Sequence, residues 1–141
     1  MTLRPLTLDD SKSFFYASWD DNVAHVLPGF YCDSEEKARN VITKLTTDPK
    51  IKALAICNSA NTFAGVIVIV ETGKKEIEIS SFIDKEFRHQ GLATQSLQQV
   101  ISMYKGYNIC FQVEPYNTYS VKIMEKFGAI LRNTYYYHIY A

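Results

Sequence analysis

The segment Arg88-His-Gln-Gly91-Leu-Ala93-Thr94 joins an apolar, strand-like stretch to the start of a helix-like one. The first backbone N–H groups of a helix have no partner inside it, and with the helix dipole they form a site for anions. Gly91 lets a ligand approach the backbone closely, and Ala93 keeps the second position small. Arg88 adds a positive charge and Thr94 a hydroxyl donor. We therefore predict a phosphate or pyrophosphate site at this turn.

The elements that must position this turn follow from the pattern of apolar residues and of turn formers. The expected strands cover residues 3–6, 51–57, 63–71, 76–83 and 108–113. The expected helices begin at Thr7, at Asp33 or Ser34, at Gly91 and near Asn117, and the last three end near Leu45, Tyr104 and Phe127. Residues 129–140 are rich in strand formers and are either one bent strand or a hairpin.

In two of these elements, the residue pattern also predicts where individual side chains point. The first helix is expected to turn Phe14, Phe15 and Trp19 inward. Residues 76–83 alternate, so that Ile77, Ile79, Ser81 and Ile83 share one face and Glu76, Glu78, Ser80 and Phe82 share the other. The order β-α-α-β-β-β-α-β-α-β predicts an α/β fold, in which an antiparallel meander leads into a strand–helix–strand unit and helices pack over the sheet.

Composition limits the class of protein. The 141 residues suit a single domain covering residues 1–141, and the net charge of zero argues against binding to nucleic acid or to an anionic membrane. No apolar run reaches the length of a membrane span, and the N-terminus lacks a signal-peptide pattern. Cys32, Cys57 and Cys110 are odd in number and widely spaced, which favours neither a disulfide framework nor a metal site. A cytoplasmic protein without a metal is the expectation.

The sequence resembles the GNAT superfamily of N-acetyltransferases over most of its length. The stretch from Ile83 to Leu97 is similar to the family's acetyl-CoA motif, Arg/Gln-x-x-Gly-x-Gly/Ala. A second match runs from Val113 to Gly128 and contains Asn117-x-x-Ser120 followed by Glu-Lys-x-Gly. This second motif is most similar to that of the branch that includes ribosomal-protein alanine N-acetyltransferases. The resemblance implies a mixed, mostly antiparallel, twisted sheet with helices on both faces and a splayed central strand pair.

The resemblance also implies acetyl-CoA as the co-substrate and assigns residues to it. The backbone of Arg88, His89, Gln90, Gly91, Leu92 and Ala93, together with the Thr94 hydroxyl, would hold the pyrophosphate of coenzyme A. Strand 76–83 would bind the pantetheine arm through its backbone in the gap that opens towards strand 108–113, near Phe82 and Ile83. Asn117 resembles the asparagine that bonds the pantetheine, and a backbone N–H near Phe82 would polarise the thioester carbonyl.

The implied reaction is direct attack of an amine on the thioester, which needs a base for the amine and a proton for the departing thiolate. Glu78 is our leading base, with Glu76 and Glu71 as alternatives. Many family members carry a tyrosine acid seven residues after the asparagine, where this chain has Met124. Ser120 is therefore the leading acid or hydrogen-bond donor, and Tyr116 and Tyr119 lie nearby.

Three functions remain open from the sequence. The first is N-acetyl transfer to a primary amine of a small molecule or of a peptide or protein N-terminus. The second is transfer of another short acyl group, and the third is an acyl-CoA-binding or sensor module without catalysis, which Met124 makes plausible. The sequence does not identify the amine, whose specificity we expect from the first two helices and loop 24–33. A monomer or a homodimer fits the sequence equally.

Overall fold

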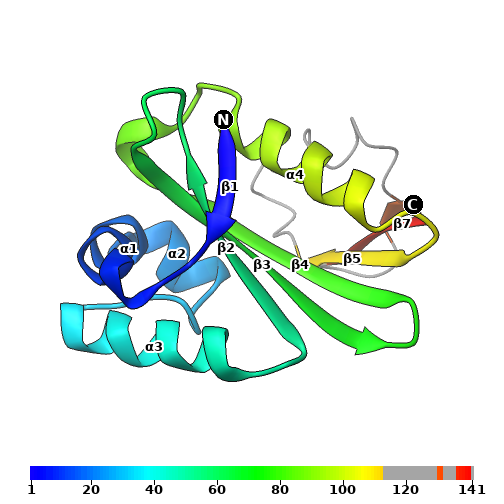
Figure 1. The fold of residues 1–141 in the computed structure, drawn as a ribbon, viewed down its shortest axis with the longest axis horizontal. Helices are drawn as coiled ribbons and strands as arrows, with labels where there is room; N and C mark the ends of the chain where they lie inside the picture. The colour runs from blue at the N-terminus through cyan, green and yellow to red at the C-terminus, as the bar shows by residue number, and fades with distance from the viewer. Residues whose placement is uncertain (113–129, 132–135, 141) are drawn as a thin grey trace.

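A computed structural model of the protein describes residues 1–112, 130–131 and 136–140. The elements in chain order are β1 (Thr2–Pro5), η1 (Leu8–Asp10), α1 (Ser11–Ser18), α2 (Asp21–Val26), α3 (Glu35–Thr47), β2 (Ile51–Cys57), β3 (Phe63–Gly73), β4 (Glu76–Ile83), η2 (Lys85–Phe87), α4 (Leu92–Met103), β5 (Asn108–Gln112), β6 (Ile130–Leu131) and β7 (Tyr136–Tyr140). The described strands form one sheet in the order β1-β2-β3-β4-β5-β7-β6 (Figure 1). All neighbouring pairs are antiparallel except β4 and β5, which are parallel.

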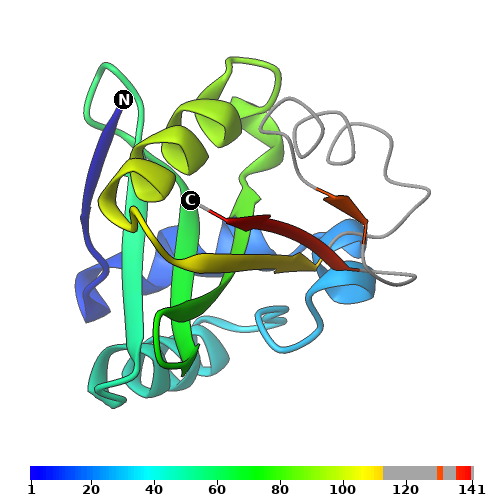
Figure 2. The same ribbon diagram turned by 90° about the vertical axis from the view of Figure 1, so that its right-hand side faces the viewer.

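Helices cover both faces of this sheet, with α4 on one side and α1, α2 and α3 on the other (Figures 1 and 2). The first face carries a core that joins α4 to the sheet through Leu92, Leu97, Val100, Ile77 and Ile79. The opposite core joins Phe14, Val23, Ile42, Val66 and Phe82. Because successive strand residues point to opposite faces, β3 supplies both cores and reads as a continuous apolar run. The mixed, mostly antiparallel sheet between helices confirms the expected fold class.

The predicted alternation in β4 is also confirmed, since Ile77 and Ile79 lie in the α4 core and Phe82 lies in the opposite one. Strands 51–57 and 76–83 have their predicted bounds, and β3 extends beyond residue 71 to Gly73. The second predicted helix is α3, whose first turn is capped by Ser34: its Oγ accepts a hydrogen bond from the backbone N of Lys37 at 3.1 Å.

Two expectations about the N-terminal half are wrong. Trp19 does not point inward but is 53% exposed, because α1 ends at Ser18 and the Trp19 indole stacks on the Phe15 ring with the centroids 5.3 Å apart. Part of the expected loop 24–33 belongs to a short helix, α2, which the sequence analysis missed. Its start signal is Asp20, whose Oδ1 accepts a hydrogen bond from the backbone N of Asn22 at 2.8 Å.

The C-terminal strands settle one alternative. Residues Ile130 and Leu131 pair antiparallel with His138 and Tyr137, so β6 and β7 form a hairpin. The predicted helix from Asn117 to Phe127 lies outside the described residues. No helix in the described part of the chain is long and apolar enough to cross a membrane.

Candidate active site

The turn before α4 has the backbone geometry of an anion site. His89 and Gly91 both have positive φ, 64° and 77°, and Gly91 is the N-cap of α4. The Gly91 carbonyl accepts the first helical bond, from the backbone N of Gln95 at 3.0 Å, and no side chain of the described residues caps this end. The N–H groups of the first turn therefore stay available to a ligand. Two αL residues close together also favour a concave arrangement of backbone N–H groups.

Glycine is required at position 91 by its conformation. At φ = +77° a residue with a Cβ atom is strained, by about 1–2 kcal/mol. The added Cβ would also lie 3.3 Å from Nε2 of Gln95. The residues that follow differ in exposure: the Leu92 side chain is buried in the core, whereas Ala93 and Thr94 are partly exposed. The Leu92 side chain therefore belongs to the core, and its role at this turn is limited to its backbone.

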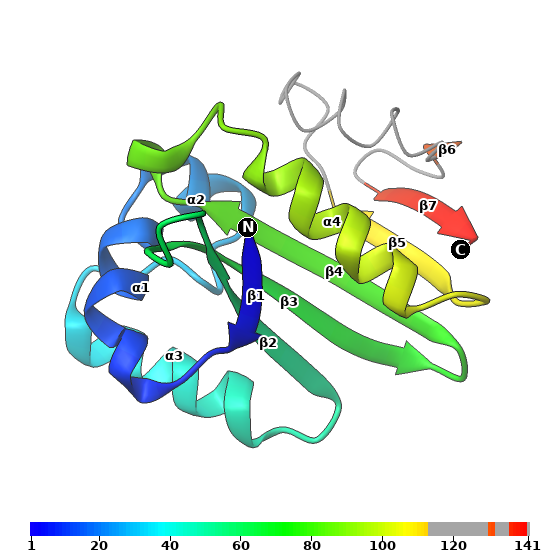
Figure 3. The same ribbon diagram turned by 45° about the horizontal axis from the view of Figure 1, so that its top comes forward.

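Arg88 has two protein partners in the structure. Its Nε donates a hydrogen bond to the carbonyl of Ile83 at 3.0 Å, and its Nη2 donates to Oδ2 of Asp20 at 3.1 Å. The sequence analysis expected the charge of Arg88 beside a phosphate. The structure adds that this charge is paired with a carboxylate 68 residues away in the chain, at the start of α2. Figure 3 shows the end of β4 next to α2.

The parallel pairing of β4 and β5 covers only the first half of β4 among the described residues. It runs from Glu76 opposite Asn108 to Ile79 opposite Phe111, and the description of β5 ends at Gln112. On its other side, β4 stays paired with β3 as far as Ile83. Gly65 stands opposite Ile83 on β3, and a Cβ there would lie 2.4 Å from the Phe82 carbonyl oxygen. The absence of a side chain at Gly65 lets β3 hold this end of β4 closely.

The hydrogen bonds between β4 and β5 show which way the backbone groups of β4 point. The backbone N of Asn108 donates to the carbonyl of Lys75, the residue before β4, at 2.9 Å. Counting from Lys75, every second residue therefore turns its backbone N–H and C=O groups towards β5. Continued past the last described pair, this alternation turns the backbone N–H groups of Ser81 and Ile83 to the β5 side of β4. The Phe82 ring packs against Phe14 and Phe30, with centroid distances of 5.5 and 6.0 Å. Any backbone donor near Phe82 on the β5 side is therefore that of Ser81 or Ile83.

The three candidate bases fall on two faces of the sheet. Glu78 lies opposite Cys110 and shares its face with Glu76, and both carboxylates act on that thiol. Burial, followed by the negative charges of Glu78 and Glu76, raises the pKa of Cys110 to about 11. Glu71 lies opposite Ile77 on β3, so it belongs to the α4 face. Glu78 is partly buried and stands one residue before the last described β4–β5 pair.

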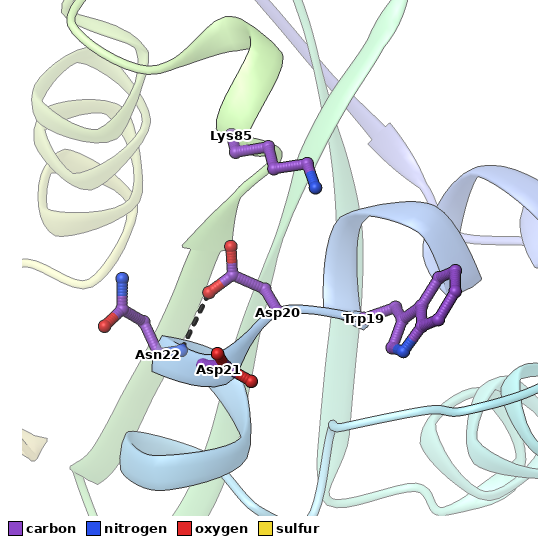
Figure 4. Close-up of a pocket in the computed structure, with 5 residues that line it drawn as sticks. All are labelled: Trp19, Asp20, Asp21, Asn22 and Lys85. Atoms are coloured by element: carbon purple, nitrogen blue, oxygen red, sulfur yellow. Dashed lines mark hydrogen bonds between the residues drawn. The ribbon is translucent and has the colours of Figure 1, made fainter.

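A polar hollow of about 460 Å³ lies between η2 and the start of α2 and is lined by Trp19, Asp20, Asp21, Asn22 and Lys85. In Figure 4, Lys85 enters from η2, and the aspartates and Asn22 come from the start of α2. The sequence analysis did not find this hollow. The run Asp20-Asp21-Asn22 was an available signal, because such residues favour a helix start.

The remaining predicted site residues, Asn117 and Ser120, lie outside the described residues, as do Met124, Tyr116 and Tyr119. Within the described part of the chain, no three His, Cys, Asp or Glu side chains group in a way that suits a metal ion.

A family model and solved structures with the same fold place this chain among known proteins. The family described as acetyltransferase (GNAT) domain matches residues 1–130. A GNAT-family acetyltransferase from Bacillus anthracis shares the fold with a TM-score of 0.78 and 23% identity, covering 98% of this chain and 93% of that one. Spermidine N-acetyltransferase from Vibrio cholerae in complex with CoA and spermine gives 0.80 and 15%, covering 97% and 90%. No curated protein matches the sequence.

The family match spans most of the chain, so this protein belongs to the GNAT acetyltransferases. It is an N-acetyltransferase whose co-substrate is acetyl-CoA and whose acceptor is an amine. The start of α4 fits that anionic co-substrate, because no side chain of the described residues caps its first N–H groups.

Proposed function

We propose that this enzyme transfers the acetyl group directly from acetyl-CoA to a primary amine of a small molecule or of a peptide or protein N-terminus. The observation that carries the proposal is the last described β4–β5 pair, at Ile79, one residue beyond Glu78, on the strand that leads to the turn 88–93. In this proposal β4 and β5 diverge beyond that pair. A donor lying along the open side of β4 would thus extend from an anion site to a carboxylate.

In this proposal, backbone N–H groups provide most of the contacts to the donor. The N–H groups of residues 89–93 and the Thr94 hydroxyl take the pyrophosphate, and Asn117 bonds the pantetheine. Supporting this assignment, α4 begins at Gly91 without a capping side chain in the described residues. The direction of the Ser81 and Ile83 N–H groups, towards the β5 side of β4, supports a role for β4 in binding the pantetheine and the thioester carbonyl.

In the proposed reaction Glu78 accepts a proton from the amine, and the amine nitrogen attacks the thioester carbon. An N–H of Ser81 or Ile83 stabilises the oxygen that becomes negative, and the C–S bond then breaks. Ser120 gives a proton or a hydrogen bond to the departing thiolate. The position of Glu78 beside the proposed strand divergence favours it over Glu71, which lies on the α4 face.

Two of the three cysteines, Cys32 and Cys110, support direct attack over a route through an acyl-cysteine. A nucleophilic cysteine needs a lowered pKa so that the thiolate is present near neutral pH. Burial and the neighbouring glutamates instead raise the pKa of Cys110 to about 11. Burial likewise raises the pKa of Cys32, and its side chain is fully enclosed. Neither thiol is therefore set up to carry the acetyl group.

Release of free thiol from acetyl-CoA tests the proposal when amino acids, aminoglycosides, polyamines and N-terminal peptides are offered in turn. Turnover with at least one amine, without acetylation of the enzyme when no amine is present, is the expected result. Binding of acetyl-CoA without turnover on any amine would favour the sensor module. Comparison with propionyl-CoA addresses the alternative of another short acyl group. Loss of less than about tenfold in Ser120→Ala would remove Ser120 as the acid, since a general acid contributes about 10²–10⁴-fold.

A further inference from the structure

The carboxylate of Asp20 joins the start of α2 to the turn that the proposed function assigns to the donor. Its Oδ1 caps α2 by accepting from the backbone N of Asn22 at 2.8 Å, and its Oδ2 accepts from Nη2 of Arg88 at 3.1 Å. The same guanidinium donates through Nε to the carbonyl of Ile83 at 3.0 Å. One continuous chain of hydrogen bonds therefore connects the start of α2, the turn before α4 and the last residue of β4.

This connection is sheltered from water. The side chains of Arg88 and Asp20 are 29% and 10% exposed, so solvent and salt weaken their attraction less than at an open surface. The two residues are far apart in sequence, and this ion pair lies where α2 passes the end of β4 (Figure 3). Holding Arg88 fixes both ends of η2, because the carbonyl of Ile83 precedes that turn and Arg88 follows it.

A capping role alone does not account for Asp20. Serine and asparagine cap helices about as well as aspartate does, and a cap needs only one acceptor atom. The second carboxylate oxygen of Asp20 instead accepts from the guanidinium of Arg88, and Arg88 directly precedes the turn in which His89 and Gly91 have positive φ. That second contact restrains the Arg88 side chain beside the turn.

We propose that Asp20 is a positioning residue that acts through Arg88 to set the turn 88–93 for the diphosphate of the acyl-CoA donor. This inference rests on the proposed function. It assigns to a residue on the α2 side of the protein an effect on donor binding. In this arrangement the Arg88 guanidinium mainly links the end of β4 to the start of α2. The backbone N–H groups of the turn, and not the guanidinium, bind the phosphates.

The test compares Asp20→Ser with the matched control Asp21→Ser. Asp20→Ser keeps a hydroxyl that can cap α2 but removes the carboxylate that pairs with Arg88. Asp21→Ser removes the same charge from the neighbouring residue, which is exposed and lines the same polar hollow. Calorimetry with CoA is expected to show a Kd about tenfold higher in Asp20→Ser, and a change within about twofold in Asp21→Ser. Should Asp20→Ser fail to fold, Asp20→Asn keeps the size and the cap and loses the charge.

A shorter ligand separates positioning from general damage. Pantetheine lacks the diphosphate, so its Kd is expected to be the same in the wild type and in Asp20→Ser. The double variant Asp20→Ser/Arg88→Gln is expected to bind CoA no more weakly than the weaker single variant, because the two residues act as one unit.

Unchanged or tighter CoA binding in Asp20→Ser would overturn the inference, as would an equal loss of affinity for pantetheine and CoA. These results leave the proposed function intact, since the wild type would still bind CoA and release thiol from acetyl-CoA. If the wild type does neither, the proposed function fails and this inference fails with it.

Discussion

Glu78 lies directly opposite Cys110 in the parallel register of β4 and β5, one position before the last described pair of the two strands. The carboxylate and the thiol therefore share a face of the sheet, next to the point where the proposed function has β4 and β5 diverge. Burial, followed by the charges of Glu78 and Glu76, raises the pKa of Cys110 to about 11, so the thiol is protonated at neutral pH. Of the two groups, only the carboxylate is suited to accept a proton from an amine.

Replacing Glu78 by glutamine is expected to lower the rate of acetyl transfer by about 10²–10⁴-fold, because a positioned general base contributes that much. Glutamine keeps the shape and a hydrogen-bond acceptor but does not take up a proton. The deficit should shrink as the pH rises towards the pKa of the acceptor amine, since the amine then loses its proton in solution. A pH profile of kcat/KM for both proteins measures this. A deficit of equal size at every pH would mean that Glu78 acts in binding or shape.

Glu76→Gln and Glu71→Gln are the controls for this variant. Glu76 shares the face of Glu78 but lies further from the divergence, and Glu71 lies on the α4 face. Both are exposed, and each replacement is expected to leave kcat/KM within about threefold, as a distant surface substitution does. A larger loss in either one than in Glu78→Gln would transfer the role of base to that residue.

Glu78→Gln is also expected to lower the pKa of Cys110, because a negative charge near a thiol disfavours the thiolate. The pH dependence of alkylation at Cys110, followed by mass spectrometry, measures the pKa. Its midpoint should move to lower pH in Glu78→Gln. In Glu71→Gln, whose side chain lies across the sheet, it should stay where it is in the wild type. An unchanged midpoint in Glu78→Gln would contradict the register of the two strands.

The raised pKa of Cys110 makes the free energy of unfolding fall as the pH rises. The pKa of Cys110 is raised in the folded state from 9.0 to about 11, so the folded protein holds the proton more tightly than the unfolded chain does. Its contribution to stability is complete below pH 9 and is lost as the pH rises towards 11. Denaturant unfolding of Cys110→Ser should show a smaller fall in the free energy of unfolding over this interval than the wild type does.

The sequence was sufficient for the elements whose signals are local. The alternation of Ile77 and Ile79 with Glu76 and Glu78 predicted β4 with its correct bounds, and Gly91 predicted the turn before α4. These predictions hold because burial on one side, or a positive φ, restricts the residue type directly. The expected splay of β4 from β5 came from the family resemblance, since no residue pattern in either strand encodes where pairing stops.

The parts that sequence reasoning missed depend on contacts between distant residues. The helix α2 has only six residues, which is too short for a recognisable period, and Asp20 is more readily read as part of a surface loop. Its partner Arg88 is 68 residues away. Trp19 was assigned to the core by its apolar character, but α1 ends one residue before it. Nothing within either segment indicates that the start of α2 meets the end of β4.

Gly91→Ala is expected to weaken CoA binding by more than about tenfold, because the strain at φ = +77° would be relieved by moving the N–H groups of the first turn. Gly106→Ala is the matched control. Gly106 also has a positive φ, 86°, has no atom within 4 Å of an added Cβ, and follows the opposite end of α4. Thermal unfolding should show a similar loss of Tm in both variants, whereas calorimetry should show weaker CoA binding only in Gly91→Ala. Equal Kd values in the two variants would contradict a diphosphate site at this turn.

Gly65→Ala is expected to destabilise the protein by about 1–3 kcal/mol and to weaken CoA binding, since overpacking of this kind moves the backbone. The added Cβ would lie 2.4 Å from the Phe82 carbonyl and 2.9 Å from Cδ1 of Ile83, so this end of β4 must move away from β3. Gly73→Ala, in the same strand, places its Cβ at an ordinary 3.6 Å from Cβ of Glu76 and should change the free energy of unfolding by less than about 0.5 kcal/mol. Denaturant unfolding and calorimetry with CoA measure both effects. A loss of stability in Gly65→Ala with unaltered CoA affinity would show that the donor does not lie along this end of β4.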